Sequence, residues 1–158
     1  MRRLFLTLLP IAASCAAAQE RRNELIAGWG VAQVFDEERI DGFSLEYRHQ
    51  PLALNLSPMV GYSRASGGGA SLVYLGANYP VDLNDHWRLS PSFAVGYFDG
   101  GGGFNLGGEL EFRSGIELNR LLGEHWRIGA ALTHISNGHL YDFNPGTEAL
   151  ILSLHYGF

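Results

Sequence analysis

The sequence contains no lysine and only one cysteine, Cys15, which lies in an apolar N-terminal stretch. A chain without that stretch has neither disulfides nor cysteine-based metal sites, so packing and hydrogen bonds must hold its fold. The net charge is −5 at pH 7, and loss of Arg2 and Arg3 with the stretch lowers it by two, to −7. This acidic balance, with arginine as the only strongly basic side chain, argues against a nucleic-acid partner.

The N-terminal stretch follows the three-part pattern of a secretory signal. Two arginines precede an apolar run, and Ala16 to Ala18 form an Ala-x-Ala cleavage site. We expect residues 1–18 to be a cleaved signal peptide and residues 19–158 to form one domain of about 140 residues. A membrane anchor is one alternative, although the run is shorter than the ~20 residues of a spanning helix. Lipoprotein cleavage before Cys15 is another, although Ala-Ala-Ser is a poor lipobox.

Long apolar runs are absent from the rest of the chain, which excludes a membrane helix there. Apolar side chains instead alternate with polar or small ones, a period typical of β-strands. In the stretch 149–158, every second residue from Leu150 to Phe158 is large and apolar. The same pattern predicts eight strands, near residues 24–34, 41–49, 53–64, 70–80, 86–98, 106–118, 125–136 and 147–158.

Alternation alone does not decide which face of a barrel is apolar. A soluble barrel has an apolar interior, whereas a membrane barrel has an apolar outer wall. The export signal, the even number of strands of ~9–11 residues and the closing Phe158 in strand phase favour the membrane form. We therefore predict an all-β protein, an eight-stranded antiparallel transmembrane β-barrel of the outer-membrane type.

This fold assigns a direction to the alternating side chains. The leucines of the apolar face should point away from the barrel axis, namely Leu110, Leu132, Leu150, Leu152 and Leu154. The charged face should fill a lumen too narrow for a channel. There we expect Glu46, Glu109, Glu111 and Glu117 to pair with Arg48, Arg88, Arg113 and Arg127.

Three polar residues interrupt the apolar face of the last two strands. Period two places His134 and Ser136 in phase with Leu132, and Glu148 in phase with Leu150. Ionisable groups facing lipid are costly, so they call for a functional explanation. A pairing that sets His134 opposite Glu148 would give a serine nucleophile a base and an orienting carboxylate.

The loop between these strands, residues 137–146, adds hydrogen-bond donors. Asn144 and the backbone N–H groups of the turn at Gly138 could form an oxyanion hole. The alternative interpretation is that the three polar residues are rim side chains where the strands leave the bilayer.

The motif resembles a known family signature. His-x-Ser-Asn-Gly at residues 134–138, followed by Asn-Pro-Gly-x-Glu at residues 144–148, is similar to the signature of the lipid A 3-O-deacylase (PagL) family. The order, the spacing and the position at the last hairpin match. The signal peptide and the barrel pattern extend the resemblance over the whole chain.

The resemblance implies a serine carboxylic-ester hydrolase in the outer membrane of a Gram-negative bacterium, acting on lipid A of the outer-leaflet lipopolysaccharide. Ser136 would attack the ester at the 3 position, with His134 as general base and Glu148 orienting it. Asn144 and the backbone N–H of His139 would hold the oxyanion, and Asn137 would position the loop. The stretch 141–143, Tyr-Asp-Phe, is a departure that bears on the acyl groove.

We expect neither a cofactor nor a metal, because no set of His, Asp and Glu has clear metal-ligand spacing. The sequence leaves the oligomeric state open, including a homodimer. Two other functions remain open as well. One is a non-enzymatic outer-membrane barrel with a structural or adhesive role, and the other is a soluble periplasmic barrel with an apolar ligand inside.

Overall fold

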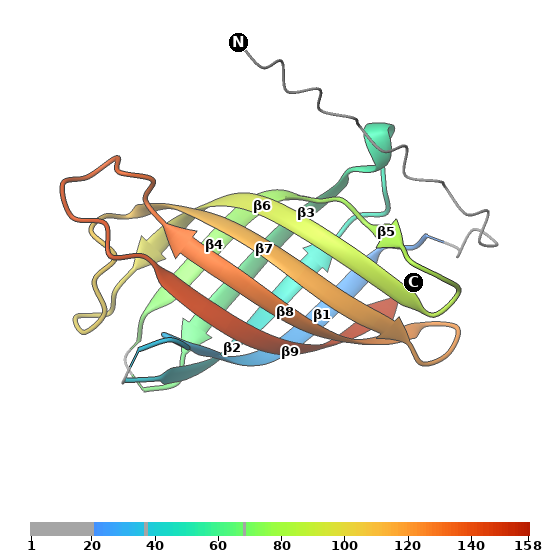
Figure 1. Ribbon diagram of the computed structural model, residues 1–158, viewed down its shortest axis with the longest axis horizontal. Helices are drawn as coiled ribbons and strands as arrows, with labels where there is room; N and C mark the ends of the chain where they lie inside the picture. The colour runs from blue at the N-terminus through green and yellow to red at the C-terminus, as the bar shows by residue number, and fades with distance from the viewer. Residues whose placement is uncertain (1–20, 37, 68) are drawn as a thin grey trace, which may run out of the picture.

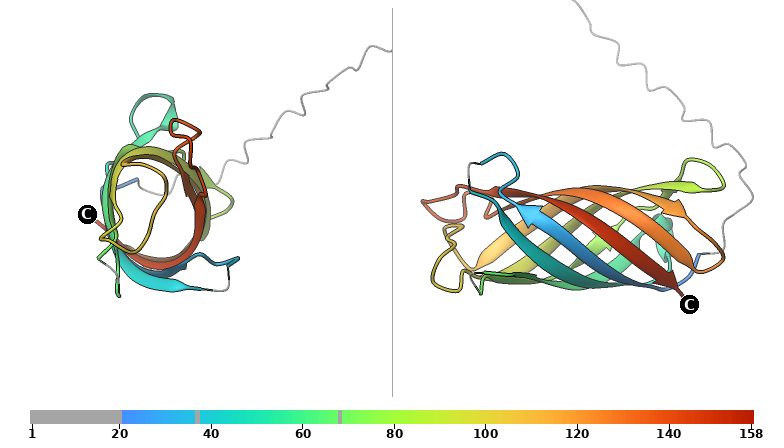
Figure 2. Two further views of the ribbon diagram at one scale, coloured as in Figure 1. Left: turned by 90° about the vertical axis from the view of Figure 1, so that its left-hand side faces the viewer. Right: turned by 90° about the horizontal axis from the view of Figure 1, so that it is seen from below.

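The alternating stretches form antiparallel strands that close into a barrel, seen from the side in Figure 1 and end-on in Figure 2. The computed structural model describes residues 21–36, 38–67 and 69–158, so the predicted signal peptide, residues 1–18, lies outside the described residues. The strands are β1 (Glu24–Ala32), β2 (Ile40–Arg48), β3 (Ser57–Ala65), β4 (Ser71–Asn78), β5 (Val81–Asp82), β6 (Trp87–Asp99), β7 (Leu110–Leu121), β8 (Trp126–Ser136) and β9 (Thr147–Gly157). Consecutive strands pair from β1 to β4 and from β5 to β9. In addition β1 pairs with β9 and β4 pairs with β6, which closes the ring.

Eight strands form the wall, as predicted, and β5 is a two-residue ladder beside β6. Two strand starts differ from the prediction. Residues 53–55 form a 3-10 turn, η1 (Ala53–Asn55), because Leu54 and Asn55 adopt positive φ values of 60° and 62° that a strand does not allow. The strand predicted from residue 106 begins only at Leu110, after a bend at Gly107 with φ of 98°.

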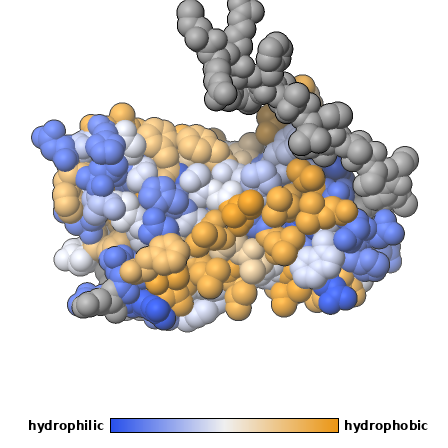
Figure 3. All heavy atoms as spheres, in the orientation of Figure 1, coloured by the Kyte–Doolittle hydropathy of each residue, from blue (hydrophilic) through white to orange (hydrophobic). Residues whose placement is uncertain are grey.

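The outer wall is apolar, as the membrane barrel requires. Leu152 is 63% exposed, and Leu110, Leu132, Leu150 and Leu154 are exposed as well. In Figure 3, hydrophobic side chains gather across the middle of the visible wall and hydrophilic ones at the two ends. Leucines on the outside contradict the soluble barrel with an apolar interior.

Arginine and glutamate side chains fill one half of the lumen. Arg48 pairs with Glu46 and with both carboxylate oxygens of Glu117, at 3.0 and 3.1 Å. Arg88 and Arg127 lie beside Glu24, a partner that the alternation did not identify. Each of these five buried side chains thus has an opposite charge beside it, which offsets its desolvation, and so does Glu24.

The expected lumen pairing was wrong for three residues. Glu109 is exposed rather than lumenal, because it precedes the first residue of β7 and its carboxylate turns outward to Tyr97. Glu111 does point inward and is fully buried, yet neither of its carboxylate oxygens has a hydrogen-bond partner among the residues that the structure describes. Arg113 also points inward, but it stacks on the Tyr74 ring, 4.7 Å from the centroid.

The two ends of the barrel differ in their connections and in the lining of the lumen. Glu24 and Gly157 are paired at one end, which we call the terminal end. The connections 33–39, 66–70, 100–109 and 137–146 lie at the other, the loop end, where the lumen is apolar and contains Leu72, Phe98 and Leu106. Among the described residues, no helix is long and apolar enough to cross a membrane.

Candidate active site

The two ionisable members of the predicted site are paired. The β8–β9 register sets His134 opposite Glu148, and His134 Nδ1 lies 2.9 Å from Glu148 Oε1. Both side chains are on the outer face of the wall and about half exposed at most, at 47% and 33%. The hydrogen bond fixes Nδ1 toward the carboxylate, so Nε2 is free to act as a base.

Ser136 is the last residue of β8, two positions beyond His134 on the same face. Continuing the register from Ile135 and Thr147 puts Ser136 opposite Gly146. The Nε2 side of the His134 ring faces this pair, since a Cβ added to Gly146 would lie 3.1 Å from His134 Cε1 and 3.7 Å from Nε2. No hydrogen bond joins Ser136 to His134 among the described residues, and in unliganded enzymes such bonds often form only when substrate binds.

Asn137 ties the loop beside Ser136 to the barrel mouth. Its side chain points inward, is fully buried, and donates from Nδ2 to the carbonyls of Leu106 and Phe143, both at 2.9 Å. Its Oδ1 accepts the backbone N–H of His139 at 3.0 Å. One amide thereby links the β8–β9 loop to the β6–β7 connection, which suits a positioning residue.

Asn144 is oriented by the backbone next to Ser136. The Asn137 N–H donates to Asn144 Oδ1 at 3.1 Å, which turns the Asn144 Nδ2 group the other way, to within 3.4 Å of His139 Nδ1. The Asn144 amide is thus held by the residue next to Ser136, with its Nδ2 group directed toward the His139 ring. The backbone N–H of His139 is already engaged by Asn137 Oδ1, so an oxyanion would have to share it.

The surface around the site is apolar. Phe112 is the β7 partner of Ser136 and stacks on Phe93, with centroids 5.9 Å apart. In the loop, Tyr141 is fixed: its hydroxyl accepts the Leu110 N–H at 3.4 Å and its ring covers Gly108, where an added Cβ would lie 1.9 Å away. Phe143 is 55% exposed at the rim. A hydrocarbon chain could therefore approach Ser136 without leaving apolar surroundings.

A second Ser-His-Glu set lies inside the lumen, and sequence reasoning missed it. Ser153 Oγ is 2.9 Å from His155 Nε2, and His155 Nδ1 is 3.2 Å from Glu24 Oε2. His155 is fully buried and its Nε2 also lies 3.5 Å from Glu117, so the set belongs to the ion-pair network. The alternation of strand residues places Ser153 and His155 on the same face, so this pair could have been predicted. Glu24 is more than a hundred residues away in the sequence, and no local pattern connects it to them.

The two sets differ in access rather than in residue type. The outer set faces the membrane, where an acyl ester could reach it, and the inner set is enclosed by the wall. Among the residues that the structure describes, no cluster of three His, Cys, Asp or Glu could hold a metal ion.

Comparison with protein families gives one match over most of the chain. The model of the family described as lipid A 3-O-deacylase (PagL) matches residues 41–157, which include all the residues of the outer set. A search of curated proteins finds no match.

Solved structures with the same fold include several outer-membrane barrels. The crystal structure of the outer membrane enzyme PagL matches with a TM-score of 0.67 and 19% identity, covering 85% of this chain and 99% of that one. The N-terminal barrel domain of Pseudomonas aeruginosa OprF matches with a TM-score of 0.61 and 15% identity, covering 88% and 100%. The attachment invasion locus protein Ail of Yersinia pestis follows at 0.53 and 14%, covering 88% and 100%. At these identities the likeness concerns the fold.

Proposed function

Because the chain belongs to the lipid A 3-O-deacylase (PagL) family of the outer membrane, we propose that it is an esterase that removes the 3-O-linked acyl chain of lipid A. Its substrate is the lipopolysaccharide of the outer leaflet, and residues 19–158 form the mature barrel. The observation that carries the proposal is the His134–Glu148 pair at 2.9 Å on the lipid-facing wall, with Ser136 in phase beside it.

In the first half of the reaction, Ser136 Oγ attacks the carbonyl carbon of the ester. His134 Nε2 takes the hydroxyl proton as the new C–O bond forms, because an unassisted serine hydroxyl is a weak nucleophile. Glu148 holds Nδ1–H and stabilises the imidazolium that results. The carbonyl oxygen becomes an oxyanion.

The Nδ2 group of Asn144 is the side-chain donor that we assign to this oxyanion. Its orientation by the Asn137 N–H prepares it before substrate arrives, which is the condition for effective electrostatic stabilisation. The His139 N–H is the second donor by family resemblance, shared with Asn137 Oδ1.

Collapse of the tetrahedral intermediate completes the transfer. The bond to the 3-oxygen of the sugar breaks, and the imidazolium of His134 gives its proton to that oxygen. The acyl chain stays on Ser136 until water, deprotonated by His134, attacks the carbonyl carbon of the acyl-enzyme. The bond from that carbon to Ser136 Oγ then breaks, His134 returns the proton to Oγ, and a fatty acid leaves. No step needs a cofactor.

Mass spectrometry of lipid A from cells with and without the protein tests the proposal. We expect the wild type to remove one 3-hydroxyacyl chain and Ser136→Ala to leave lipid A intact. Ser153→Ala is the matched control, because it removes the lumenal serine and should leave deacylation unchanged. Unmodified lipid A with well-folded wild-type barrel would contradict the proposal and favour a non-enzymatic barrel. The comparisons lend a homodimer no support, and the proposal does not include one.

A further inference from the structure

The loop end of the lumen contains a cavity of about 110 Å³ directly behind the active site. Thr133, Ile135 and Thr147 line it, and they alternate along β8 and β9 with His134 and Glu148 on the outer face. The cavity and the site thus lie on opposite faces of the same strand pair. The catalytic scheme makes no use of this cavity.

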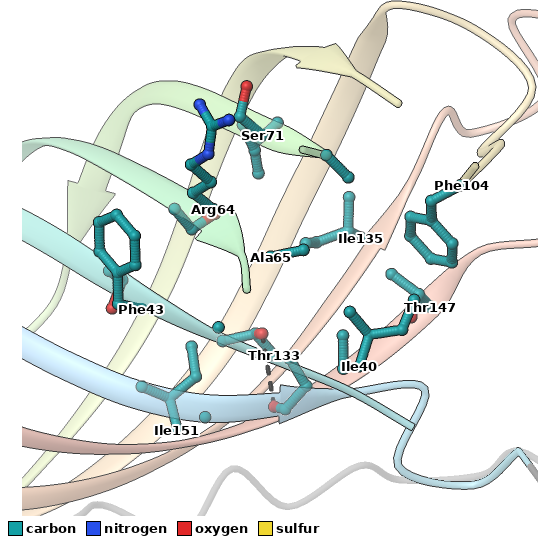
Figure 4. A pocket seen from close by; sticks show the side chains of 18 of the residues that line it. Ile40, Phe43, Arg64, Ala65, Ser71, Phe104, Thr133, Ile135, Thr147 and Ile151 are labelled. Atoms are coloured by element: carbon teal, nitrogen blue, oxygen red, sulfur yellow. Dashed lines mark hydrogen bonds between the residues drawn. The ribbon is translucent and has the colours of Figure 1, made fainter. Parts of the chain in front are cut away.

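The cavity exists because small side chains line part of the wall. Ala32, Gly42, Ala65 and Ala70 are among the lining residues, together with larger aliphatic side chains. Figure 4 shows Ala65, Ile135, Ile40 and Ile151 around a common space, with Phe104 from the β6–β7 connection beside it.

Several of the polar groups near the cavity already have partners. Thr133 Oγ1 donates to the Ala149 carbonyl at 3.5 Å, the dashed line in Figure 4. At the boundary with the charged half of the lumen, the Tyr74 hydroxyl donates to Glu46 at 2.7 Å and the Tyr74 ring is covered by Arg113. Arg64 is exposed, in register with the outward-facing Phe43. Apart from the hydroxyls of Ser44 and Ser63, the lining therefore offers a ligand mainly hydrocarbon contact.

Water in a largely apolar cavity of this kind finds few hydrogen-bond partners, so an apolar ligand displaces it at little cost. A void of roughly 10–15 Å³ admits one water-sized group. The cavity therefore has room for a row of several methylene groups. Its lining reaches Ile40 and Asp41 at the start of β2, so a chain held inside could keep its polar head at the rim.

We propose that this cavity binds a single unbranched hydrocarbon chain of an amphiphile. The chain gains dispersion contacts that an empty void forfeits, and its head group stays outside. Two sources share this chemistry, a free fatty acid and the acyl tail of a bilayer lipid. The proposal is independent of deacylation, so it can fail while the esterase proposal holds.

The isoleucines provide the readout. Ile40, Ile135 and Ile151 line the cavity, whereas Ile116 and Ile128 are about half exposed on the outer wall. We would label isoleucine methyl groups, place the full mature barrel in lipid nanodiscs and add sodium decanoate while recording methyl NMR spectra. Saturable shifts at the three cavity methyls with one equivalent bound, and much smaller shifts at the outer two, are expected. Butyrate, which fills little of the void, should bind at least tenfold more weakly.

Matched variants separate the cavity from the bilayer. Ala65→Phe places a ring in the cavity and should weaken decanoate binding at least tenfold. Ala27→Phe makes the same change on the lipid-facing wall and should leave binding unchanged. Ala70→Phe fills the cavity from the β3–β4 connection, in case Ala65→Phe does not fold.

Nuclear Overhauser effects identify the source. Contacts between Ile135 and lipid chains before decanoate is added would assign a bilayer lipid, and contacts only after addition would assign a free fatty acid. Either result supports the proposal. Equal shifts at cavity and outer methyls, unchanged binding in a folded cavity-filling variant, or no contact in either arm would overturn it.

Discussion

Glu111 and Glu117 lie six residues apart on the inward face of β7, and both are buried. Their surroundings predict opposite responses to the same substitution. Within the described part of the chain, neither carboxylate oxygen of Glu111 has a hydrogen-bond partner, whereas Glu117 accepts two bonds from Arg48 and one from Asn119. Replacing each with methionine keeps the approximate size and removes the carboxylate.

The expected magnitudes follow from these contacts. Glu111→Met removes an unsatisfied buried polar group, whose penalty is about 1–3 kcal/mol, so the free energy of unfolding should rise by a similar amount. Glu117→Met leaves Arg48 buried without its bidentate partner. Breaking such a pair costs roughly 3–5 kcal/mol, and we expect about 3 because Arg48 retains Glu46.

Denaturant unfolding of the barrel refolded into lipid vesicles measures both changes. The free energy of unfolding is extrapolated linearly to zero denaturant, and the comparison holds if the slope against denaturant concentration is the same for the wild type and both variants. The sign of the difference is the decisive observation. If both variants lost stability by similar amounts, the Glu111 carboxylate would be stabilised by a partner in the membrane-embedded barrel. The claim that it is an unsatisfied buried group would then be refuted.

Four further predictions concern the outer site. Glu148→Ala should retain more deacylase activity than His134→Ala, and the double variant should be no worse than His134→Ala alone, as kinetics on purified protein would reveal. Asn144→Ala should reduce turnover by on the order of 10²–10³, with the barrel intact by heat-modifiable gel mobility; a loss below tenfold would count against its oxyanion role. Activity should fall as the pH is lowered, because a protonated His134 cannot accept the serine proton, and a flat profile into acid would argue for another base. Gly146→Ala should lower turnover at least tenfold while KM changes less, because the added Cβ would press on the His134 ring and the φ of 67° is strained for alanine. An unchanged rate would show that the ring tolerates displacement.

Strand periodicity predicted the wall well because the membrane imposes it. Lipid on one side and a narrow polar lumen on the other force alternation on every strand, so the outward leucines and the His134–Glu148 register could be predicted. The pattern failed where it continued past a strand end. Leu52, Leu54 and Leu56 alternate like a strand, but Leu54 is 84% exposed in η1.

The lumen pairs were harder to predict because they depend on distant strands. Glu24 meets Arg88, Arg127 and His155 only once the barrel closes, and no local pattern joins them. The loop contacts of Asn137 depend in the same way on the β6–β7 connection folding over the mouth. Residue types and spacing identified the outer site, whereas the engagement of the His139 N–H became visible only in three dimensions.

The central claim is that Ser136 is the nucleophile, although the lumen holds a Ser-His-Glu set whose serine is within hydrogen-bond distance of its histidine. Treating the wild-type barrel in vesicles with a lipid-tailed phosphonate ester and mapping the adduct by peptide mass spectrometry compares the two serines in one sample. We predict a stoichiometric adduct on Ser136 that the His134→Ala variant fails to form, and none on Ser153. An adduct on Ser153, or an unmodified Ser136 in protein that still deacylates lipid A, would contradict the account.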